Sequence, residues 1–214
     1  MDDNIARIRK EYSTKVLLES EVARDPIKQF AAWWQDALEA SITEVNAMTL
    51  ATASTDGIPS ARTVLLKGFS ETGFVFFTNY NSYKAQQLME NPKACLVFFW
   101  KELERQVRLT GIIQKTSKEE NDAYFKSRPL ASQLGALASP QSQVIESRKW
   151  LDDQYEELSQ KFKEKNIERP AHWGGYVVNP VIVEFWQGRP GRLHDRIQYT
   201  LTEDGDWKME RLAP

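Results

Sequence analysis

The stretch AMTLATASTDGIPSARTVLLKGFSETGFVFFTN, residues 47–79, decides the fold class. It contains short runs of apolar, β-branched and aromatic residues, separated by Asp56-Gly57 and Thr72-Gly73. Apolar runs joined by such glycine-containing turns predict β-hairpins. We therefore expect three antiparallel strands here, with the sequences AMTLATAS, ARTVLLKGF and GFVFFTN.

Further strand-like runs and a helix follow along the chain. Residues 82–91 predict a helix that ends before Pro92, and KACLVFFW and RQVRLTGII predict two further strands. The C-terminal part adds four strand-like runs, WGGYVV, VIVEFW, DRIQYTL and WKMERL. Many short antiparallel strands with a few helices predict a mainly β (α+β) protein, an antiparallel β-barrel with peripheral helices.

Helix signals lie around these strands. Asp25 followed by Pro26 is typical of a helix start, and Ser117 and Glu120 have the spacing of a capping box. Residues 1–20 are polar, with little periodicity, and predict a short helix or an arm. The other predicted helices span residues 26–42, 117–126, 130–138 and 143–165.

Composition limits the function. The chain has 214 residues, a net charge of −2 and no repeat or low-complexity linker, so we expect one domain over residues 1–214. The absence of a basic excess argues against a general nucleic-acid or membrane-surface binder. The single cysteine, Cys95, cannot form an internal disulfide and is expected to be a core thiol. With no signal-peptide pattern and no run of membrane-spanning length, we expect a cytoplasmic protein.

Several kinds of site are disfavoured by the sequence. Two histidines and one cysteine cannot supply an ordinary zinc site, so no metal is expected. No P-loop, dinucleotide-binding glycine motif or nucleophile elbow is present.

Basic residues within or at the ends of the predicted elements are the positive signal. They are Arg62, Lys67, Lys84, Arg105 and Arg108. For any one of them, ion pairing with neighbours such as Glu102 and Glu104 is the favoured explanation. As a set beside aromatic strands, they suit a phosphorylated, planar ligand. Because Arg62 and Lys67 are an odd number apart, they share a site only if the strand bulges or Lys67 lies past its end.

A second polar group lies in YFKSRPLAS. On a helix, Tyr124 and Arg128 lie one turn apart on one face, and with Ser132 near a helix N-terminus they would form a phosphate pocket. A solvated helix end is an equally good explanation of this segment alone. Gln141-Ser142 by itself indicates only a loop.

Together these segments resemble a known family. SARTVLLK, FFTN, KELERQVRLTG, YFKSRP, SPQS, HWGGY, EFWQGRPGRLHDR and the terminal ERLAP occur in this order in the pyridoxine/pyridoxamine 5′-phosphate oxidases. The resemblance covers nearly the whole chain. It implies an FMN-binding split barrel of Greek-key topology, and a homodimer with FMN at the subunit interface and a C-terminal dimerisation region at about residues 172–214. It also implies oxidation of pyridoxine 5′-phosphate or pyridoxamine 5′-phosphate to pyridoxal 5′-phosphate, with O2 as acceptor and H2O2 as product.

The resemblance also implies roles for individual residues. The implied FMN contacts are Arg62, Thr63, Val64, Leu65, Leu66, Lys67, Phe77, Thr78, Tyr83, Lys84, Gln106, Gln141, Ser142, Trp186 and Arg196. The implied substrate contacts are Arg9, Tyr12, Lys67, Tyr124, Arg128, Ser132, Arg192, Leu193 and His194. Arg192 and His194 are the implied catalytic pair over the substrate ring. For His194, a base and a ring anchor remain alternatives.

Two positions depart from the family pattern. Tyr83 replaces an arginine that helps to hold the FMN phosphate, so FMN either binds more weakly or is held by another cation. Leu137 replaces a common tryptophan, which we expect to alter packing only. Tyr83 favours the alternative of a flavin or pyridoxal phosphate carrier without turnover, and a flavin reductase is a second alternative. The retained substrate residues, Arg128 and His194 among them, argue against both.

Overall fold

The structure is a computed structural model that describes residues 11–13, 15–163 and 166–214. Residues 1–10 of the predicted arm, including Arg9, lie outside the described part. The described residues between positions 11 and 25 form neither helix nor strand, so this part of the prediction holds as an arm.

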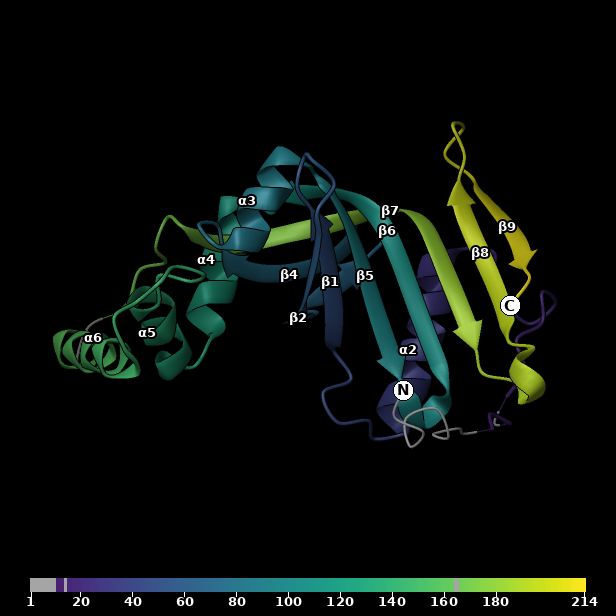
Figure 1. The fold of residues 1–214 in the computed structure, drawn as a ribbon, viewed down its shortest axis with the longest axis horizontal. Coiled ribbons are helices and arrows are strands. Elements are labelled where there is room, and N and C mark those ends of the chain that lie inside the picture. Colours follow the sequence, from purple (N-terminus) through teal and green to yellow (C-terminus); the bar gives the residue numbers. More distant parts are fainter. Residues whose placement is uncertain (1–10, 14, 164–165) are drawn as a thin grey trace, which may run out of the picture. The chain divides into compact units, whose positions relative to one another are not determined.

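The remaining described residues form nine strands and five α-helices (Figure 1). The helices are α2 (Pro26–Glu39), α3 (Tyr83–Glu90), α4 (Lys118–Ser127), α5 (Leu130–Ala138) and α6 (Arg148–Lys161), with short 3-10 turns η1 (Lys101–Leu103) and η2 (Pro190–Arg192). The strands are β1 (Ala47–Ala53), β2 (Pro59–Leu65), β3 (Gly68–Ser70), β4 (Gly73–Asn79), β5 (Lys93–Trp100), β6 (Arg105–Lys115), β7 (Trp173–Gln187), β8 (Asp195–Leu201) and β9 (Trp207–Leu212).

The strands form one sheet in the order β2-β1-β5-β6-β7-β4-β3, and β8 pairs with both β7 and β9. β7 is antiparallel to β4 over Trp173–Val178 and to β8 over Ile182–Gln187. These observations confirm a mainly antiparallel β protein with peripheral helices. No helix in the described part of the chain is both long and apolar enough to cross a membrane.

The chain divides into two compact units. The first unit comprises residues 1–50, 95–111 and 180–214, and the second comprises 51–94 and 112–179. β1, β5, β6 and β7 each contribute residues to both units.

The first unit has an aromatic core built on α2. This helix begins as predicted, because the side chain of Asp25 accepts hydrogen bonds from the backbone N–H groups of Ile27 and Lys28. Its buried face places Phe30 5.2 Å from Phe98 and Trp33 5.1 Å from Phe185, between ring centroids. Aromatic pairs at this separation add to the burial of apolar surface.

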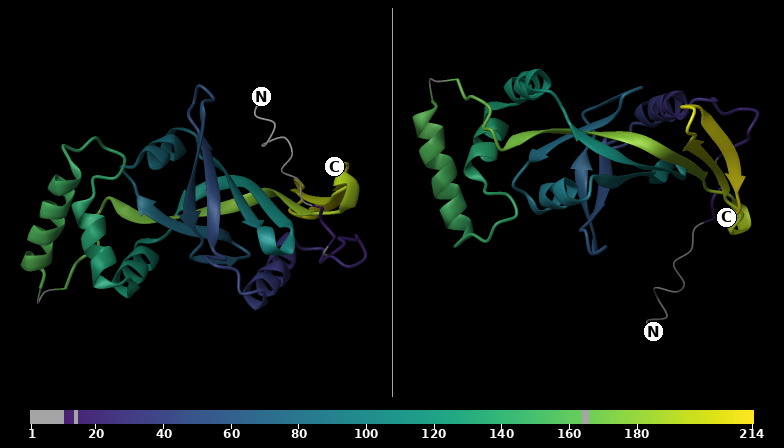
Figure 2. Two further views of the ribbon diagram at one scale, coloured as in Figure 1. Left: turned by 60° about the horizontal axis from the view of Figure 1, so that its bottom comes forward. Right: turned by 90° about the horizontal axis from the view of Figure 1, so that it is seen from above.

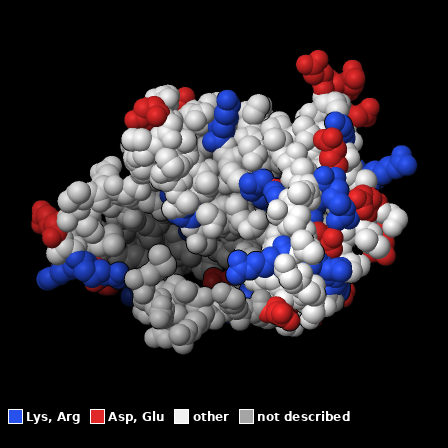
Figure 3. All heavy atoms as spheres, turned by 45° about the vertical axis from the view of Figure 1, so that its right-hand side comes forward, with Lys and Arg blue, Asp and Glu red and all other residues white. Residues whose placement is uncertain are grey.

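Charged side chains of both signs are mixed on the face shown in Figure 3, on the side of β8 and β9. Lys208 pairs with Glu210 at 2.7 Å, and Arg211 pairs with Asp195 at 2.9 Å. This mixing accords with the small net charge of the chain.

The second unit packs α4 and α5 around a cluster formed by Phe125, Leu134, Ile167 and Trp173. The capping box of Ser117 and Glu120 is present at the start of α4, as predicted. α6 lies beside α5 (Figure 2) and spans Arg148–Lys161, which is shorter than the predicted 143–165. It begins late because the Ser147 side chain accepts a hydrogen bond from the Trp150 N–H and so caps the helix there.

Two predicted strands have different limits in the structure. ARTVLLKGF was expected to be one strand, but β2 ends at Leu65 and β3 begins at Gly68. WGGYVV and VIVEFW were expected to be separate, but they are one strand, β7. Pro180 does not break β7, because it lies between the segment that pairs with β4 and the segment that pairs with β8.

Candidate functional site

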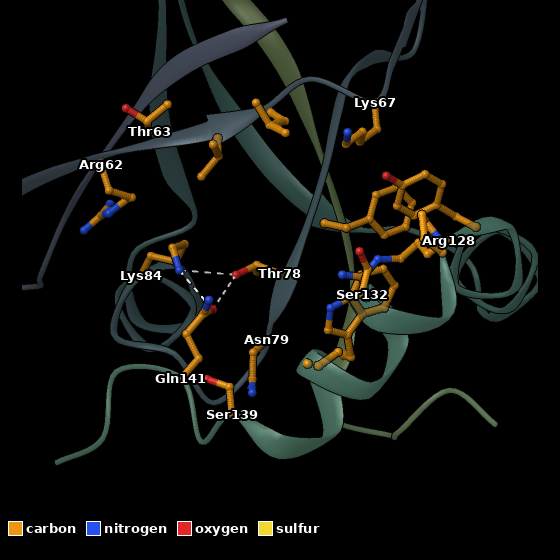
Figure 4. Close-up of a pocket in the computed structure, with 18 residues that line it drawn as sticks. Arg62, Thr63, Lys67, Thr78, Asn79, Lys84, Arg128, Ser132, Ser139 and Gln141 are labelled. Atoms are coloured by element: carbon orange, nitrogen blue, oxygen red, sulfur yellow. Dashed lines mark hydrogen bonds between the residues drawn. The ribbon is translucent and has the colours of Figure 1, made fainter. Parts of the chain in front are cut away.

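A cavity of about 670 Å³ opens in the second unit (Figure 4). Its lining comes from β2, β4, the start of β7, α3, α4, α5 and the loops that follow β2, α4 and α5. The lining residues are Arg62, Thr63, Val64, Leu65, Lys67, Phe77, Thr78, Asn79, Lys84, Tyr124, Arg128, Pro129, Ser132, Gly135, Ala136, Ser139, Gln141 and Trp173. Most residues predicted for the second unit therefore meet in one cavity.

The charged residues of this lining are all basic. Arg62, Lys67, Lys84 and Arg128 are cationic, and no Asp or Glu is among the described lining residues. In Figure 4, Arg62 and Lys84 lie toward one end of the cavity, and Lys67 and Arg128 lie toward the other. Cations at both ends suit either two anionic groups or one long anionic ligand.

Lys67 lies past the end of β2, which meets the condition for sharing a site with Arg62. After Leu65 the chain leaves the strand, and the Lys67 N–H donates to the carbonyl of Val75 at 2.8 Å. The strand pleat therefore no longer sends the two side chains to opposite faces.

At one end of the cavity, Arg62 is held by hydroxyl groups. Its Nη1 donates to Thr52 Oγ1 at 2.6 Å and its Nη2 donates to Ser60 Oγ at 2.7 Å. Burial lowers the pKa of Arg62, an effect that the charge of Tyr83 partly opposes. The guanidinium remains charged because its pKa is so high.

Lys84 lies at the same end and is 9% exposed. Its Nζ donates to Thr78 Oγ1 at 3.3 Å, Ser82 Oγ at 3.3 Å and Gln141 Oε1 at 3.2 Å. All three acceptors are neutral. Burial, and then the charge of Arg62, lower the pKa of Lys84. An anion bound at this end would offset both effects.

At the other end, Arg128 has a buried Nη1 without a hydrogen-bond partner among the described residues. Its guanidinium lies over the ring of Trp173, 4.6 Å from the ring centre, and burial lowers its pKa. A buried guanidinium nitrogen without a partner is costly, so it indicates a missing ligand.

Tyr124 and Ser132 lie at this end too. Tyr124 stacks on Phe77 with ring centres 4.0 Å apart. We predicted that Arg128 shares a helix face with Tyr124. This prediction is wrong, because α4 ends at Ser127 and Arg128 has an extended backbone. Ser132 is in the first turn of α5, as predicted.

Three predicted cofactor residues of the second unit do not line the cavity. Leu66 is buried in the core with 4% exposure. Tyr83 is the first residue of α3 and is half exposed. Ser142 follows Gln141 with a φ of 72°, an uncommon value outside glycine.

The other predicted site residues belong to the first unit, mostly in and around the loop between β7 and β8. Trp186 pairs with Arg196 across the two strands. The Trp186 ring lies 4.7 Å from the ring of His194 and 5.7 Å from that of Tyr12. At Gly188, a Cβ atom would lie 2.7 Å from the Tyr12 ring, so the aromatic group needs glycine there.

The loop also orients His194. Its Nδ1 accepts a hydrogen bond from the backbone N–H of Arg189 at 3.1 Å. Burial, and then the charge of Arg192, lower the pKa of His194. Arg192 has a φ of 62° and Leu193 is 74% exposed. The neutral imidazole is favoured, with its proton on Nε2.

Two arginines make ion pairs, but with partners other than Glu102 and Glu104. Arg105 Nη1 pairs with Asp36 of α2 at 2.6 Å, and Arg108 pairs with Glu184 of β7. Both partners come from other elements, α2 and β7, and Glu184 is 3% exposed. Glu184 also pairs with Arg196 Nε at 2.8 Å.

Gln106 lies on β6 between these arginines and is partly buried. Arg9 lies outside the described residues. Cys95 is partly buried, and burial raises the pKa of its thiol, as expected for a packing residue.

Comparison with known proteins supports one family. Residues 34–162 match the family described as "Pyridoxamine 5'-phosphate oxidase", and residues 173–214 match the "Pyridoxine 5'-phosphate oxidase C-terminal dimerisation region". A relative from Trichormus variabilis named "Pyridoxine/pyridoxamine 5'-phosphate oxidase" is 54% identical over 100% of both chains. The chain belongs to the pyridoxamine 5′-phosphate oxidase family.

Solved structures agree with this membership. PhzG from Burkholderia lata 383, in complex with tetrahydrophenazine-1-carboxylic acid, is 29% identical with a TM-score of 0.88, covering 94% of this chain and 100% of its own. An FMN binding protein from Nostoc punctiforme, related to pyridoxamine 5′-phosphate oxidase, is 20% identical with a TM-score of 0.70, covering 89% and 98%. The latter bears on the fold alone. The predicted split-barrel fold is confirmed, and the family supports a flavin-dependent oxidoreductase.

The cavity fits such a cofactor. A flavin mononucleotide has an anionic phosphate and a flat ring system. The Arg62 and Lys84 end offers two cations without an acid, and the lining includes apolar strand residues such as Val64 and Leu65. These features accommodate a phosphate and an adjoining ring.

Sequence reasoning missed several polar residues that form hydrogen bonds with predicted site residues or with their partners. They are Thr52, Ser60, Gln87 and Glu184. Neutral polar residues in strands and helices carry no motif, so only the structure reveals Thr52, Ser60 and Gln87. Glu184 could have been suspected as an acid inside the apolar run VIVEFW, since buried acids need partners.

Proposed function

We propose that this chain is an FMN-dependent oxidase that converts pyridoxine 5′-phosphate and pyridoxamine 5′-phosphate to pyridoxal 5′-phosphate, with O2 as acceptor and H2O2 as product. The observation that carries the proposal is the unpartnered Arg128 Nη1 at the cavity end opposite Arg62 and Lys84. One cofactor phosphate would use only one end. A second phosphate, on the substrate, accounts for the other.

The assignment of residues follows the family pattern. In the second unit, the cofactor is assigned to residues 62–67, Phe77, Thr78, Tyr83, Lys84, Gln141 and Ser142, and the substrate phosphate to Tyr124, Arg128 and Ser132. In the first unit, Gln106, Trp186 and Arg196 are assigned to the cofactor, and Tyr12, Arg192, Leu193 and His194 to the substrate, with Arg9 beyond the described part. The match to a dimerisation region supports a homodimer as the functional form.

The chemistry divides between cofactor and protein. When bound, the flavin supplies the redox chemistry, taking two electrons from the substrate and passing them to O2. The protein binds, orients and screens the reactants. Arg128 would bind the substrate phosphate in a partly dry site, where a charge-assisted hydrogen bond is strong, and so would fix the position of the pyridine ring.

His194 is proposed as a ring anchor rather than a base. Its Nδ1 already accepts the Arg189 N–H, and its lowered pKa favours the neutral ring. The remaining proton is then on Nε2, which can donate a hydrogen bond to a substrate oxygen. Arg192, beside it, adds positive charge that would stabilise an oxyanion on that ring.

An anaerobic visible spectrum tests the proposal. The purified protein is reconstituted with FMN, pyridoxine 5′-phosphate is added, and air is then admitted. We expect the flavin band to bleach with substrate and to recover in air, with release of peroxide. Arg192→Ala should bind FMN and bleach much more slowly. A bound flavin that the substrate fails to bleach would contradict the proposal and favour a carrier or, if NADPH bleaches it, a reductase.

The likeness to PhzG gives a competing substrate. Tetrahydrophenazine-1-carboxylic acid, which that protein binds, carries a carboxylate and no phosphate. The cationic Arg128 end, with Ser132 at a helix start, favours a phosphate. Faster bleaching by the tetrahydrophenazine than by pyridoxine 5′-phosphate would reverse this preference.

A further inference from the structure

Gln87, on α3, lies behind the cationic end of the cavity without lining it. It is 2% exposed. Its Oε1 accepts hydrogen bonds from Thr52 Oγ1 at 2.5 Å and from Ser60 Oγ at 2.6 Å. The same two hydroxyls are the groups that contact Arg62 Nη1 and Nη2, at 2.6 and 2.7 Å. Four side chains from β1, β2 and α3 thus form one closed network.

Chemistry fixes the direction of the hydrogen bonds that join Arg62 to the two hydroxyls and the two hydroxyls to Gln87. A guanidinium can only donate, so both hydroxyls must accept from Arg62. Each hydroxyl has a single hydrogen, which it must then donate elsewhere. The carbonyl oxygen of Gln87 has two lone pairs and accepts both. An amide turned the other way would present N–H groups to hydroxyls that need an acceptor.

This arrangement has an energetic cost at the amide nitrogen of Gln87. Gln87 Nε2 is buried and has no hydrogen-bond partner among the described residues. Leaving a buried donor unpaired costs roughly 1–3 kcal/mol. An unpaired donor lowers the stability of the fold, so stability alone does not explain Gln87 at this position. We therefore look for a role for its oxygen, Oε1, which accepts from both hydroxyls.

We infer that Gln87 is a positioning residue, which fixes the guanidinium of Arg62 for an anion bound between it and Lys84. Arg62 and Lys84 line the same end of the cavity (Figure 4), and the charge of Arg62 lowers the pKa of Lys84, so one anionic group between them would interact with both cations. That the anion is the phosphate of FMN rests on the proposed function. The positioning of Arg62 does not rest on it, because the network that holds Arg62 consists of protein side chains alone.

The test compares Gln87→Met with Gln86→Met. Methionine has a similar length and no strong acceptor, and Gln86 is an exposed neighbour on the same helix. In ligand-free protein, nitrogen NMR of the arginine side chains follows rotation of the Arg62 guanidinium, assigned from the signal lost in Arg62→Lys. Calorimetry then measures the dissociation constants of FMN and of riboflavin, which lacks the phosphate.

We expect restricted guanidinium rotation in the wild type and in Gln86→Met, and faster rotation in Gln87→Met. We expect the FMN dissociation constant of Gln87→Met to rise about tenfold, which corresponds to one charge-assisted hydrogen bond, while that of riboflavin stays the same. If Gln87→Met does not fold, Thr52→Val, which removes one of the two hydroxyls, should change both readouts in the same direction.

The outcomes distinguish the positioning role of Gln87 from the proposed function. Unchanged Arg62 rotation in both variants would overturn the positioning role, whatever the protein binds. Equal weakening of FMN and riboflavin would also overturn it, because a general loss of structure would affect both ligands. A wild type that binds no FMN would overturn the proposed function, while the NMR comparison would still decide the role of Gln87.

Discussion

Four described arginines, Arg62, Arg105, Arg128 and Arg196, fall into two kinds according to the groups that surround their charge. Arg105 and Arg196 pair with carboxylates, of Asp36 and Glu184. Arg62 has hydroxyl partners and Arg128 lies over an aromatic ring. Within a cavity, a cation surrounded by neutral groups can still pair with an anionic ligand. A cation that is already paired with a carboxylate is neutralised within the fold.

Arg128→Met should therefore weaken substrate binding without weakening cofactor binding. The substitution keeps an apolar chain against Trp173 and removes the guanidinium that carries the unpartnered Nη1. We expect KM for pyridoxine 5′-phosphate to rise at least about tenfold, from the loss of a charge-assisted hydrogen bond. Steady-state kinetics measure it. Lys126→Met, on the exposed surface of α4, is the control, and equal KM values in the two variants would contradict the assignment.

The pKa of His194 gives a second test at this scale. Burial, and then the charge of Arg192, lower it from 6.5. We expect NMR titration of the imidazole to give a midpoint below 6.5, and Arg192→Ala to raise it by removing a like charge. The unfolded chain binds the proton at higher pH, so this group should make folding less favourable as pH falls through 6.5. A midpoint that Arg192→Ala leaves unchanged would exclude the charge as a cause.

Single residues also show where sequence reasoning stops. Asp25 and the Ser117–Glu120 capping box were predictable because each acts on its own backbone. Lys84 and Arg128 were singled out as basic residues near helix ends, and the resemblance then assigned their roles. The role of Gln87 and the pairing of Arg108 with Glu184 were not predictable, because they depend on which elements become neighbours.

At the scale of elements, the break between two strands positions a residue of the cavity. The gap between β2 and β3 places Lys67 beside the cavity. The local pattern of ARTVLLKGF reads as a continuous strand, since apolar residues flank the break. Pairing partners decide where such a strand ends, and partners are tertiary information.

The start of α2 provides an element-scale prediction. Asp25→Ala removes the side-chain acceptor for the N–H groups of Ile27 and Lys28. We expect a loss of about 1 kcal/mol in the free energy of unfolding, measured by urea denaturation. Lys28→Ala, exposed in the first turn of the same helix, should stay within about 0.5 kcal/mol of wild type. Equal losses would mean that helix propensity, not the cap, governs this end.

At the scale of the whole chain, residues 17–19 are joined to the C-terminal strands β8 and β9. Arg211 of β9 pairs with Glu19 at 2.5 Å and donates to the carbonyl of Leu17 at 2.8 Å, while the Leu17 N–H donates to Asp195. These bonds hold a segment without regular structure against the C-terminal strands of the first unit. The sequence predicted an arm here but not its attachment, because the partners are about 190 residues apart.

This attachment should depend on pH. Hydrogen bonding to Arg211 lowers the pKa of Glu19 from 4.5 to about 2. A lowered carboxyl pKa stabilises the fold above 4.5, and this contribution is lost as pH falls from 4.5 to about 2. We expect Glu19→Gln to melt below wild type at neutral pH and the difference to shrink across that range. Glu21→Gln, an exposed neighbour, is the control. A difference that persists at the acid end would contradict the pairing.

The division of the sequence between the two units also bears on how the protein can be cut. The first unit needs three separate segments and the second needs two, and β1, β5, β6 and β7 cross from one to the other without a loop. No single truncation point can therefore yield either half as an independently expressed fragment. A stop codon inside β1, β5 or β6 removes part of both halves at once. Function in this chain is therefore better dissected by point substitution than by deletion.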